Sequence, residues 1–156
     1  MNDATLKHLA TLSEDLNRAS DALSKQITSV EEALNGLKLG VWAWVEISRY
    51  VDAESVTSGG KPLEVMRTEQ LGYGKHRGKW GLLYSIDLDE DPDMTTIMPL
   101  RDAPRMEKLA AVEKIPDLIQ KIESNAHEVM ERANDQAGKV GAVAAALRKV
   151  GKSHDQ

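Results

Sequence analysis

The feature that most constrains the fold is a seven-residue repeat of apolar residues near the N-terminus. Leucine or valine recurs at this spacing from Leu9 to Leu37, at positions 9, 16, 23, 30 and 37. Such spacing is typical of a helix with one apolar face. With Asp3 as the expected N-cap and Asn35-Gly36 as the expected stop, the helix runs from about residue 4 to residue 35 and is roughly 50 Å long. A compact globule of 156 residues is only about 40 Å across. The helix therefore either projects from the globule or lies beside another long helix.

A second apolar stripe lies in the C-terminal third, where apolar residues alternate three and four positions apart: Val112, Ile115, Ile119, Ile122, Ala126, Val129 and Ala133. Pro116 interrupts this stripe, and proline is well accommodated only in the first turn of a helix. We therefore expect a short helix at about 104–114 and a longer one from 116 to about 135.

Two interpretations of these stripes remain open and are compatible with each other. In the first, the two long helices form an intramolecular antiparallel pair packed on a sheet. In the second, the N-terminal stripe mediates self-association into a homodimer or a higher oligomer. The interface residues would then be Leu9, Leu12, Leu16, Leu23 and Val30.

The middle of the chain predicts an antiparallel sheet. All aromatic residues lie between positions 42 and 84, and aromatic and β-branched residues favour strands. Alternation predicts a strand at 41–48. The Ser/Gly/Pro-rich segment 57–62 is expected to be a flexible turn or loop. Further extended runs follow at about 63–75 and 79–88, and a short fourth strand near 95–98 is left open. Arg77-Gly78 is placed for a two-residue hairpin turn. In that register Gly74 faces Gly81, and Tyr73 faces Leu82.

The two faces of this hairpin differ in side-chain size. Gly72, Gly74 and Gly81 line one face, and glycine inside a strand indicates close approach of another group. We expect a helix on this face, with a bound ligand as the alternative. The aromatic residues form either a second hydrophobic layer or a surface for a protein partner. These residues are Trp42, Trp44, Tyr73, Trp80 and Tyr84.

The order of elements predicts an α+β fold. It consists of a long N-terminal helix, a three- to four-stranded antiparallel sheet, two C-terminal helices and a short amphipathic tail. We expect one domain at 1–137, divided into a helix (1–36), a sheet (37–100) and helices (104–136). The segment 138–156 is expected to be a tail, either a short helix or disordered.

Candidate chemistry is sparse. The chain contains no cysteine, and no phosphate-binding loop, dinucleotide fingerprint or nucleophile elbow is present. Glu123, His127 and Glu131 share a helical face that we interpret as a solvated salt-bridging face. The acidic segment 87–93 resembles the start of a calcium loop, but Pro92 stands where glycine is required. We expect no catalytic residue, metal or cofactor, and therefore no enzyme activity.

Two functions follow from these features. The first is a non-catalytic interaction or assembly module that oligomerises through the long helix and captures a partner on the aromatic sheet face. The alternative is a small binder of nucleic acid, nucleotide or phosphate ligand that uses the hairpin tip at 75–80, with Lys75, His76, Arg77 and Lys79. The net charge of −5 disfavours nucleic acid. The apolar runs are too short to span a membrane, and the N-terminus does not resemble a signal peptide, so we expect a cytoplasmic protein.

Overall fold

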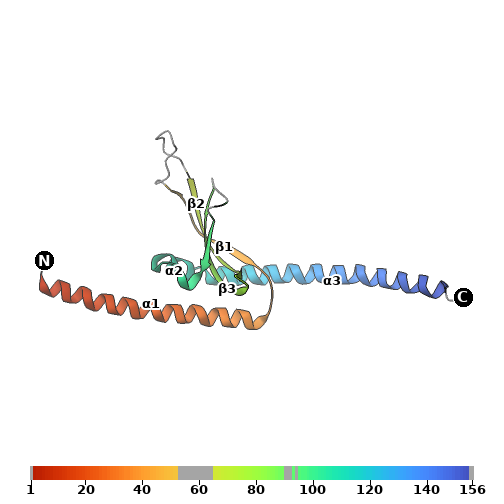
Figure 1. Cartoon of the computed structure of the whole chain (residues 1–156), viewed down its shortest axis with the longest axis horizontal. Helices are drawn as coiled ribbons and strands as arrows, with labels where there is room; N and C mark the ends of the chain where they lie inside the picture. Colours follow the sequence, from red (N-terminus) through yellow and green to blue (C-terminus); the bar gives the residue numbers. More distant parts are fainter. Residues whose placement is uncertain (1, 53–64, 90–92, 94, 155–156) are drawn as a thin grey trace.

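The structure, a computed structural model, describes residues 2–52, 65–89, 93 and 95–154. The loop predicted at 57–62 lies outside the described residues. The elements are α1 (Asp3–Leu37), β1 (Ala43–Asp52), β2 (Val65–His76), β3 (Lys79–Leu88), β4 (Thr96–Pro99), the 3-10 turn η2 (Leu100–Asp102), α2 (Arg105–Val112) and α3 (Ile115–His154). The four strands form one antiparallel sheet in the order β1-β2-β3-β4 (Figure 1). The predicted α+β fold is therefore confirmed.

The ends of α1 differ slightly from the prediction. Asn2, and not Asp3, is the N-cap, and its side chain accepts a hydrogen bond of 3.3 Å from the backbone N–H of Ala4. The helix passes Asn35-Gly36 and ends at Leu37, where Lys38 adopts a left-handed conformation with φ of 53°. A left-handed residue at this position directs the chain away from the helix axis and towards β1.

The predicted hairpin register is confirmed. Gly74 faces Gly81 and Tyr73 faces Leu82. Arg77 and Gly78 both have positive φ angles, 51° and 81°. This combination is the one that a type I′ turn requires, and its twist matches that of the flanking strands. The two-residue turn therefore sets the register of the whole β2–β3 ladder.

One irregularity in β1 was not predicted. The pairing of β1 with β2 shifts between Glu46 and Ser48, so that Ile47 is an extra residue in a β-bulge. A bulge reverses the alternation of side chains beyond it. Ser48 consequently lies on the same face as Val45, opposite Glu69.

The core lies on one face of the sheet, between the strands and all three helices. The sheet contributes Ala43, Leu71, Tyr73, Leu82 and Tyr84 to this buried cluster. The helices contribute Ile27 and Leu34 of α1, Ala111 of α2, and Leu118 and Ile122 of α3. Both long helices therefore use part of their apolar stripe to cover the same face of the sheet.

The opposite face shows why the strands contain glycine, and it corrects one prediction. The indole ring of Trp44 lies directly over Gly72, and that of Trp42 lies over Gly74, where a Cβ atom would overlap the ring. Tryptophan side chains from β1 and the segment before it, and not a helix or a ligand, occupy this space. Gly81 instead faces α1, with Oε1 of Glu31 at 2.9 Å from the position of a Cβ atom.

The arrangement of the long helices also differs from the prediction. α1 and α3 run in the same direction across the sheet, so the predicted antiparallel pair is wrong (Figure 1). The helix predicted to end near residue 136 continues as α3 to His154, and the segment from 138 onward is part of it. The N-terminal part of α1 and the C-terminal part of α3 project from opposite ends of the molecule.

Candidate interaction surfaces

The N-terminal part of α1 projects with its apolar stripe partly open to solvent. Every residue from Asn2 to Ala19 is exposed. Leu6, which the prediction did not include, and the predicted Leu9, Leu12 and Leu16 together form an apolar stripe on this part of α1 and retain between 46% and 53% of their accessible surface. Leu23 and Val30 are partly buried against the core. The five predicted interface residues thus divide into three on the projecting part of α1 and two on the part that covers the sheet.

Polar contacts from α2 hold the middle of α1. Arg105 donates hydrogen bonds to Oγ of Ser20 at 2.8 Å and to Oδ1 of Asn17 at 2.9 Å. Lys108, which is buried, donates to Oγ of Ser24 at 3.2 Å. These contacts fix the direction in which the residues before Asn17 leave the body of the molecule.

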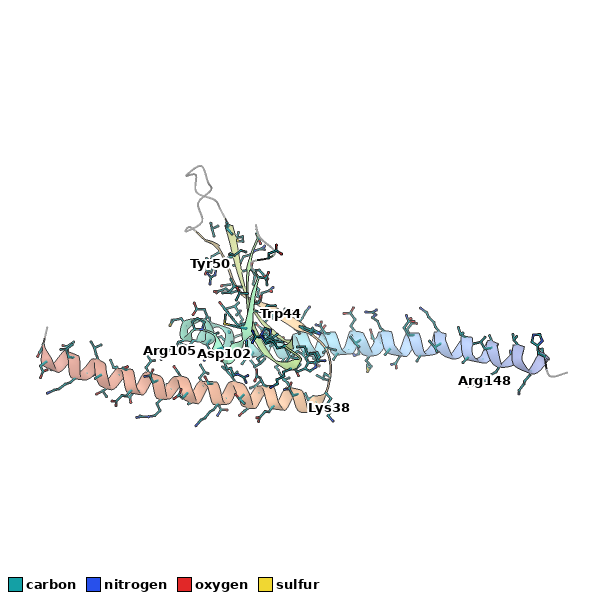
Figure 2. The ribbon with its side chains drawn as sticks, viewed as in Figure 1. Lys38, Trp44, Tyr50, Asp102, Arg105 and Arg148 are labelled. Carbon is teal, nitrogen blue, oxygen red and sulfur yellow. The ribbon has the colours of Figure 1, made fainter. Side chains whose placement is uncertain are left out.

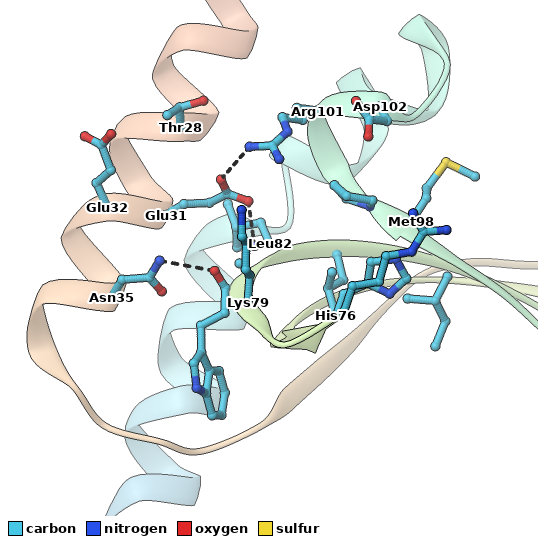
Figure 3. Close-up of a pocket in the computed structure, with 16 residues that line it drawn as sticks. Thr28, Glu31, Glu32, Asn35, His76, Lys79, Leu82, Met98, Arg101 and Asp102 are labelled. Atoms are coloured by element: carbon cyan, nitrogen blue, oxygen red, sulfur yellow. Dashed lines mark hydrogen bonds and ion pairs between the residues drawn. The ribbon is translucent and has the colours of Figure 1, made fainter.

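Two side chains of α1 fasten its C-terminal half to the sheet. β4 begins to pair with β3 only at Leu83, so the preceding residues of β3 form a free edge. Oε1 of Glu31 accepts a hydrogen bond of 2.8 Å from the backbone N–H of Leu82, and Nδ2 of Asn35 donates one of 3.1 Å to the carbonyl oxygen of Trp80 (Figure 3). Arg101 adds an ion pair to Glu31 at 3.8 Å. α1 thus takes the place that a longer β4 would occupy along this edge of β3.

The C-terminal part of α3 is the second projecting surface. From His127 to His154 every residue except Ala144 is exposed. Its stripe residues Val140, Val143, Leu147 and Val150 retain between 57% and 66% of their accessible surface. Sequence reasoning treated these residues as a separate tail. The sequence does contain a pattern that predicts one continuous helix. The alternation of three and four positions continues from Val112 to Val150, with Gln136 as its one polar member.

The aromatic residues predicted as a partner surface do not form one exposed patch. Tyr73 is 3% exposed and Tyr84 is 1% exposed, because both belong to the core beneath the helices. Trp44 and Trp80 are half-buried, and Trp42 is 48% exposed. Trp80 lies against both Trp42 and Tyr73, with ring centroids 5.7 Å and 5.4 Å apart. The group is therefore mainly structural.

A buried carboxylate lies next to Tyr84. Glu69 accepts hydrogen bonds from the hydroxyl of Tyr84 at 2.6 Å, from Oγ of Ser48 at 2.7 Å and from Arg67 at 3.3 Å. Burial alone would raise the pKa of Glu69, but these hydrogen bonds and the charge of Arg67 outweigh it and lower the pKa. Burial, followed by the hydrogen bond to Glu69, raises the pKa of Tyr84. The network holds a charged carboxylate in place and leaves its two oxygens occupied.

The hairpin tip brings the predicted basic residues together, but among acidic ones. Lys75, Arg77 and Lys79 are exposed and His76 is half-buried. Three of the four line a groove of about 660 Å³ between the tip, β4 and α1 (Figure 3). Glu31, Glu32, Arg101 and Asp102 line the same groove. The acidic side chains reduce the positive potential that a phosphate backbone would require.

The described residues contain no group of three or more potential ligands arranged to hold a metal ion. His127 and Glu131 form an exposed pair at 3.2 Å on α3, which agrees with a solvated face.

None of the described helices combines the length and the hydrophobicity needed to cross a membrane. Figure 2 shows the side chains along the two projecting helices, with Arg148 near the end of α3.

No protein-family model matches the chain, and no curated protein or solved structure is detectably similar to it.

Proposed function

We propose that this chain is a non-catalytic assembly protein that associates with itself through its projecting helices. The observation that carries the proposal is the stripe of Leu6, Leu9, Leu12 and Leu16, which lies half-exposed on a helix that has already left the body of the molecule. A helix without a packing partner is marginal in water, because most helical stability in proteins comes from packing of the apolar face.

The energetics favour burial of this stripe. Full burial of a leucine side chain is worth roughly 1.5–3 kcal/mol, and about half of each leucine is already covered. Completing the burial therefore contributes roughly 1 kcal/mol per leucine. A second projecting helix at the other end of the molecule adds further apolar surface, and together these contributions offset the entropic cost of association.

The aromatic sheet face and the basic hairpin tip support a function less well than the projecting helices do. Capture of a partner on the aromatic face would require Tyr73 and Tyr84 to be accessible, and both are in the core. Binding of nucleic acid at the hairpin tip would bring a phosphate backbone close to Glu31, Glu32 and Asp102.

Analytical ultracentrifugation of the full chain, from low to high micromolar concentration, tests the proposal. We expect a dimer or a higher oligomer, and we expect Leu9→Glu and Leu16→Glu to shift the chain towards monomer. Thr11→Glu is the matched control, because it introduces the same charge on the opposite, exposed face of α1. Self-association would be ruled out if the wild-type chain has the helical content of the structure and yet stays monomeric at high micromolar concentration.

A further inference from the structure

The projecting part of α3 has the properties of a helix that requires a partner. Its stripe from Val140 to Val150 is more exposed than the stripe on α1. The projecting part of α3 also contains Gly138 and Gly141, where an added Cβ atom would meet no other part of the molecule within 4 Å. Glycine in an exposed helix costs about 1 kcal/mol relative to alanine. Packing of the apolar stripe against another surface would offset this cost.

The charges of the two projecting segments are complementary. Residues 136–154 carry four basic side chains and no acidic one: Lys139, Arg148, Lys149 and Lys152. Residues 3–21 of α1 carry four acidic side chains, Asp3, Glu14, Asp15 and Asp21, against two basic ones. Within the helices, Lys7 is paired with Asp3 at 3.3 Å, Arg18 with Asp15 at 3.2 Å, and Lys139 of α3 with Asp135 at 3.0 Å. The net charge is therefore −2 for residues 3–21 and +3 for residues 135–154. Like segments would repel one another and unlike segments would attract.

The shape of the chain makes the unlike pairing simple to achieve. α1 and α3 run in the same direction and project at opposite ends (Figure 1). A two-fold axis perpendicular to both helices reverses their direction and exchanges the two ends. It therefore places the projecting part of α3 from a second copy at the same end as the projecting part of α1 from the first, in antiparallel orientation. The same rotation forms an identical pair at the other end.

We infer that the occupant of the α1 stripe is the C-terminal part of α3 from a second copy of this chain, in a closed two-fold dimer with two antiparallel helix pairs. The inference rests on the proposed self-association and adds the partner surface. Pairing of α1 with α1 would join two acidic segments and leave both α3 stripes in water. The unlike pairing covers both stripes and joins opposite charges.

Charge reversal in the full chain tests the pairing. One variant carries Lys139→Glu, Arg148→Glu and Lys149→Glu, which leaves one basic and three acidic side chains at the end of α3. The other carries Glu14→Lys and Asp15→Lys, which makes the start of α1 basic. Each variant alone places like charges in both helix pairs, and we expect its dissociation constant to rise at least tenfold. In a one-to-one mixture both pairs again join opposite charges, and we expect a heterodimer close to wild-type affinity.

The matched control reverses two charges outside the projecting segments, Lys25→Glu with Lys121→Glu, and should associate like wild type. Circular dichroism establishes that each variant keeps its helices. A wild-type chain that associates while the α3 variant is unaffected would overturn the pairing and leave self-association standing. A wild-type chain that does not associate overturns both.

Disulfide cross-linking gives an independent measurement, because the natural chain contains no cysteine. Chains with one cysteine at Leu9, Leu12 or Leu16 are mixed with chains with one cysteine at Val140, Val143 or Leu147 and are then oxidised. We expect covalent dimers from at least one mixture and not from either member alone. Cross-linking of the α1 variants to themselves, with none in any mixture, would overturn the inference. A chain that carries both cysteines should stop at the dimer, and a ladder of larger products would contradict the closed two-fold arrangement.

Discussion

The carboxylate of Glu31 lies 2.8 Å from the backbone nitrogen of Leu82 and takes the place of the strand that is missing there. Glu31 is buried, Gly81 leaves room for it, and Arg101 lies on its other oxygen. We expect Glu31→Ala to lower the free energy of unfolding by roughly 2–3 kcal/mol, because a buried N–H loses its acceptor. Glu31→Gln retains an acceptor and should cost less. Urea denaturation measures both, with exposed Glu32→Ala as the control, and equal stability of the Glu31→Ala and Glu32→Ala variants would contradict this role.

Asn35 makes the second attachment of α1 to this edge. Its Oδ1 accepts a hydrogen bond of 2.6 Å from the hydroxyl of Tyr73, and its Nδ2 donates to Trp80. We expect Asn35→Ala to lower the free energy of unfolding by about 1–2 kcal/mol, and Tyr73→Phe to lower it by about 1 kcal/mol. The two substitutions remove a shared hydrogen bond, so the double variant should lose less than the sum of the single losses. Strict additivity in urea denaturation would show that the bond contributes nothing.

The network around Glu69 predicts a dependence of stability on acidic pH. The pKa of Glu69 is lowered in the folded chain, mainly by hydrogen bonds from Tyr84 and Ser48 that overcome the effect of burial. A lowered pKa contributes stability above the ordinary glutamate pKa of about 4.3, and this contribution is lost as the pH falls through the folded value. The difference in free energy of unfolding between wild type and Glu69→Gln should therefore shrink as the pH is lowered below about 4. A difference that is constant across this range would exclude the mechanism.

The raised pKa of Tyr84 predicts that the folded chain loses stability as the pH rises into the alkaline range. Burial and the neighbouring Glu69 raise its pKa, so the unfolded chain ionises this tyrosine at a lower pH than the folded chain does. A raised pKa contributes stability below the ordinary tyrosine pKa of about 10, and this contribution is lost as the pH rises. Wild type should lose more stability than Tyr84→Phe above about pH 10, as measured by chemical denaturation at fixed pH. Equal losses of stability in wild type and Tyr84→Phe would contradict a raised pKa of Tyr84 in the folded chain.

The tryptophan–glycine contacts predict a large effect from one methyl group. In Gly74→Ala the new Cβ would overlap the indole ring of Trp42, so the ring must move and become more exposed. We expect a loss of roughly 1–3 kcal/mol, which is typical of overpacking, together with a red shift of tryptophan fluorescence. Gly36→Ala is the control, because the space around Gly36 in α1 is open, and it should raise stability by about 1 kcal/mol. An unshifted spectrum for Gly74→Ala would refute the contact.

The parts of this fold that could be predicted are those set by local pattern. Arg77-Gly78 specifies a turn whose length sets the register, so all pairs along β2 and β3 followed from two residues. The long α1 also followed from the periodicity of its apolar residues, whereas the sequence left the fourth strand open. The direction of α3 relative to α1 could not be predicted, because a stripe of apolar residues covers a sheet equally well in either orientation.

The missed features depend on tertiary contacts. Glu31 and Asn35 look like ordinary polar residues of a helix, and only the early end of β4 gives them a role at the edge of β3. The bulge at Ile47 carries no glycine or proline signal, although it determines that Ser48 reaches Glu69. The helix predicted to end near residue 135 continues to His154, and Gly138 lies within it, because a glycine costs a helix only about 1 kcal/mol.

The exposure of α3 beyond His127 predicts how its backbone amides exchange with deuterium. Exposed backbone hydrogen bonds at the end of a helix open locally, without unfolding of the domain, so the amide protons of this segment should exchange with deuterium quickly in the monomer. The amides of the buried strands β2 and β3 exchange only when the domain opens. Slow exchange of the amides near Leu147 would therefore show that a partner covers this segment. This measurement identifies the covered residues one by one and does not depend on the mass of the oligomer.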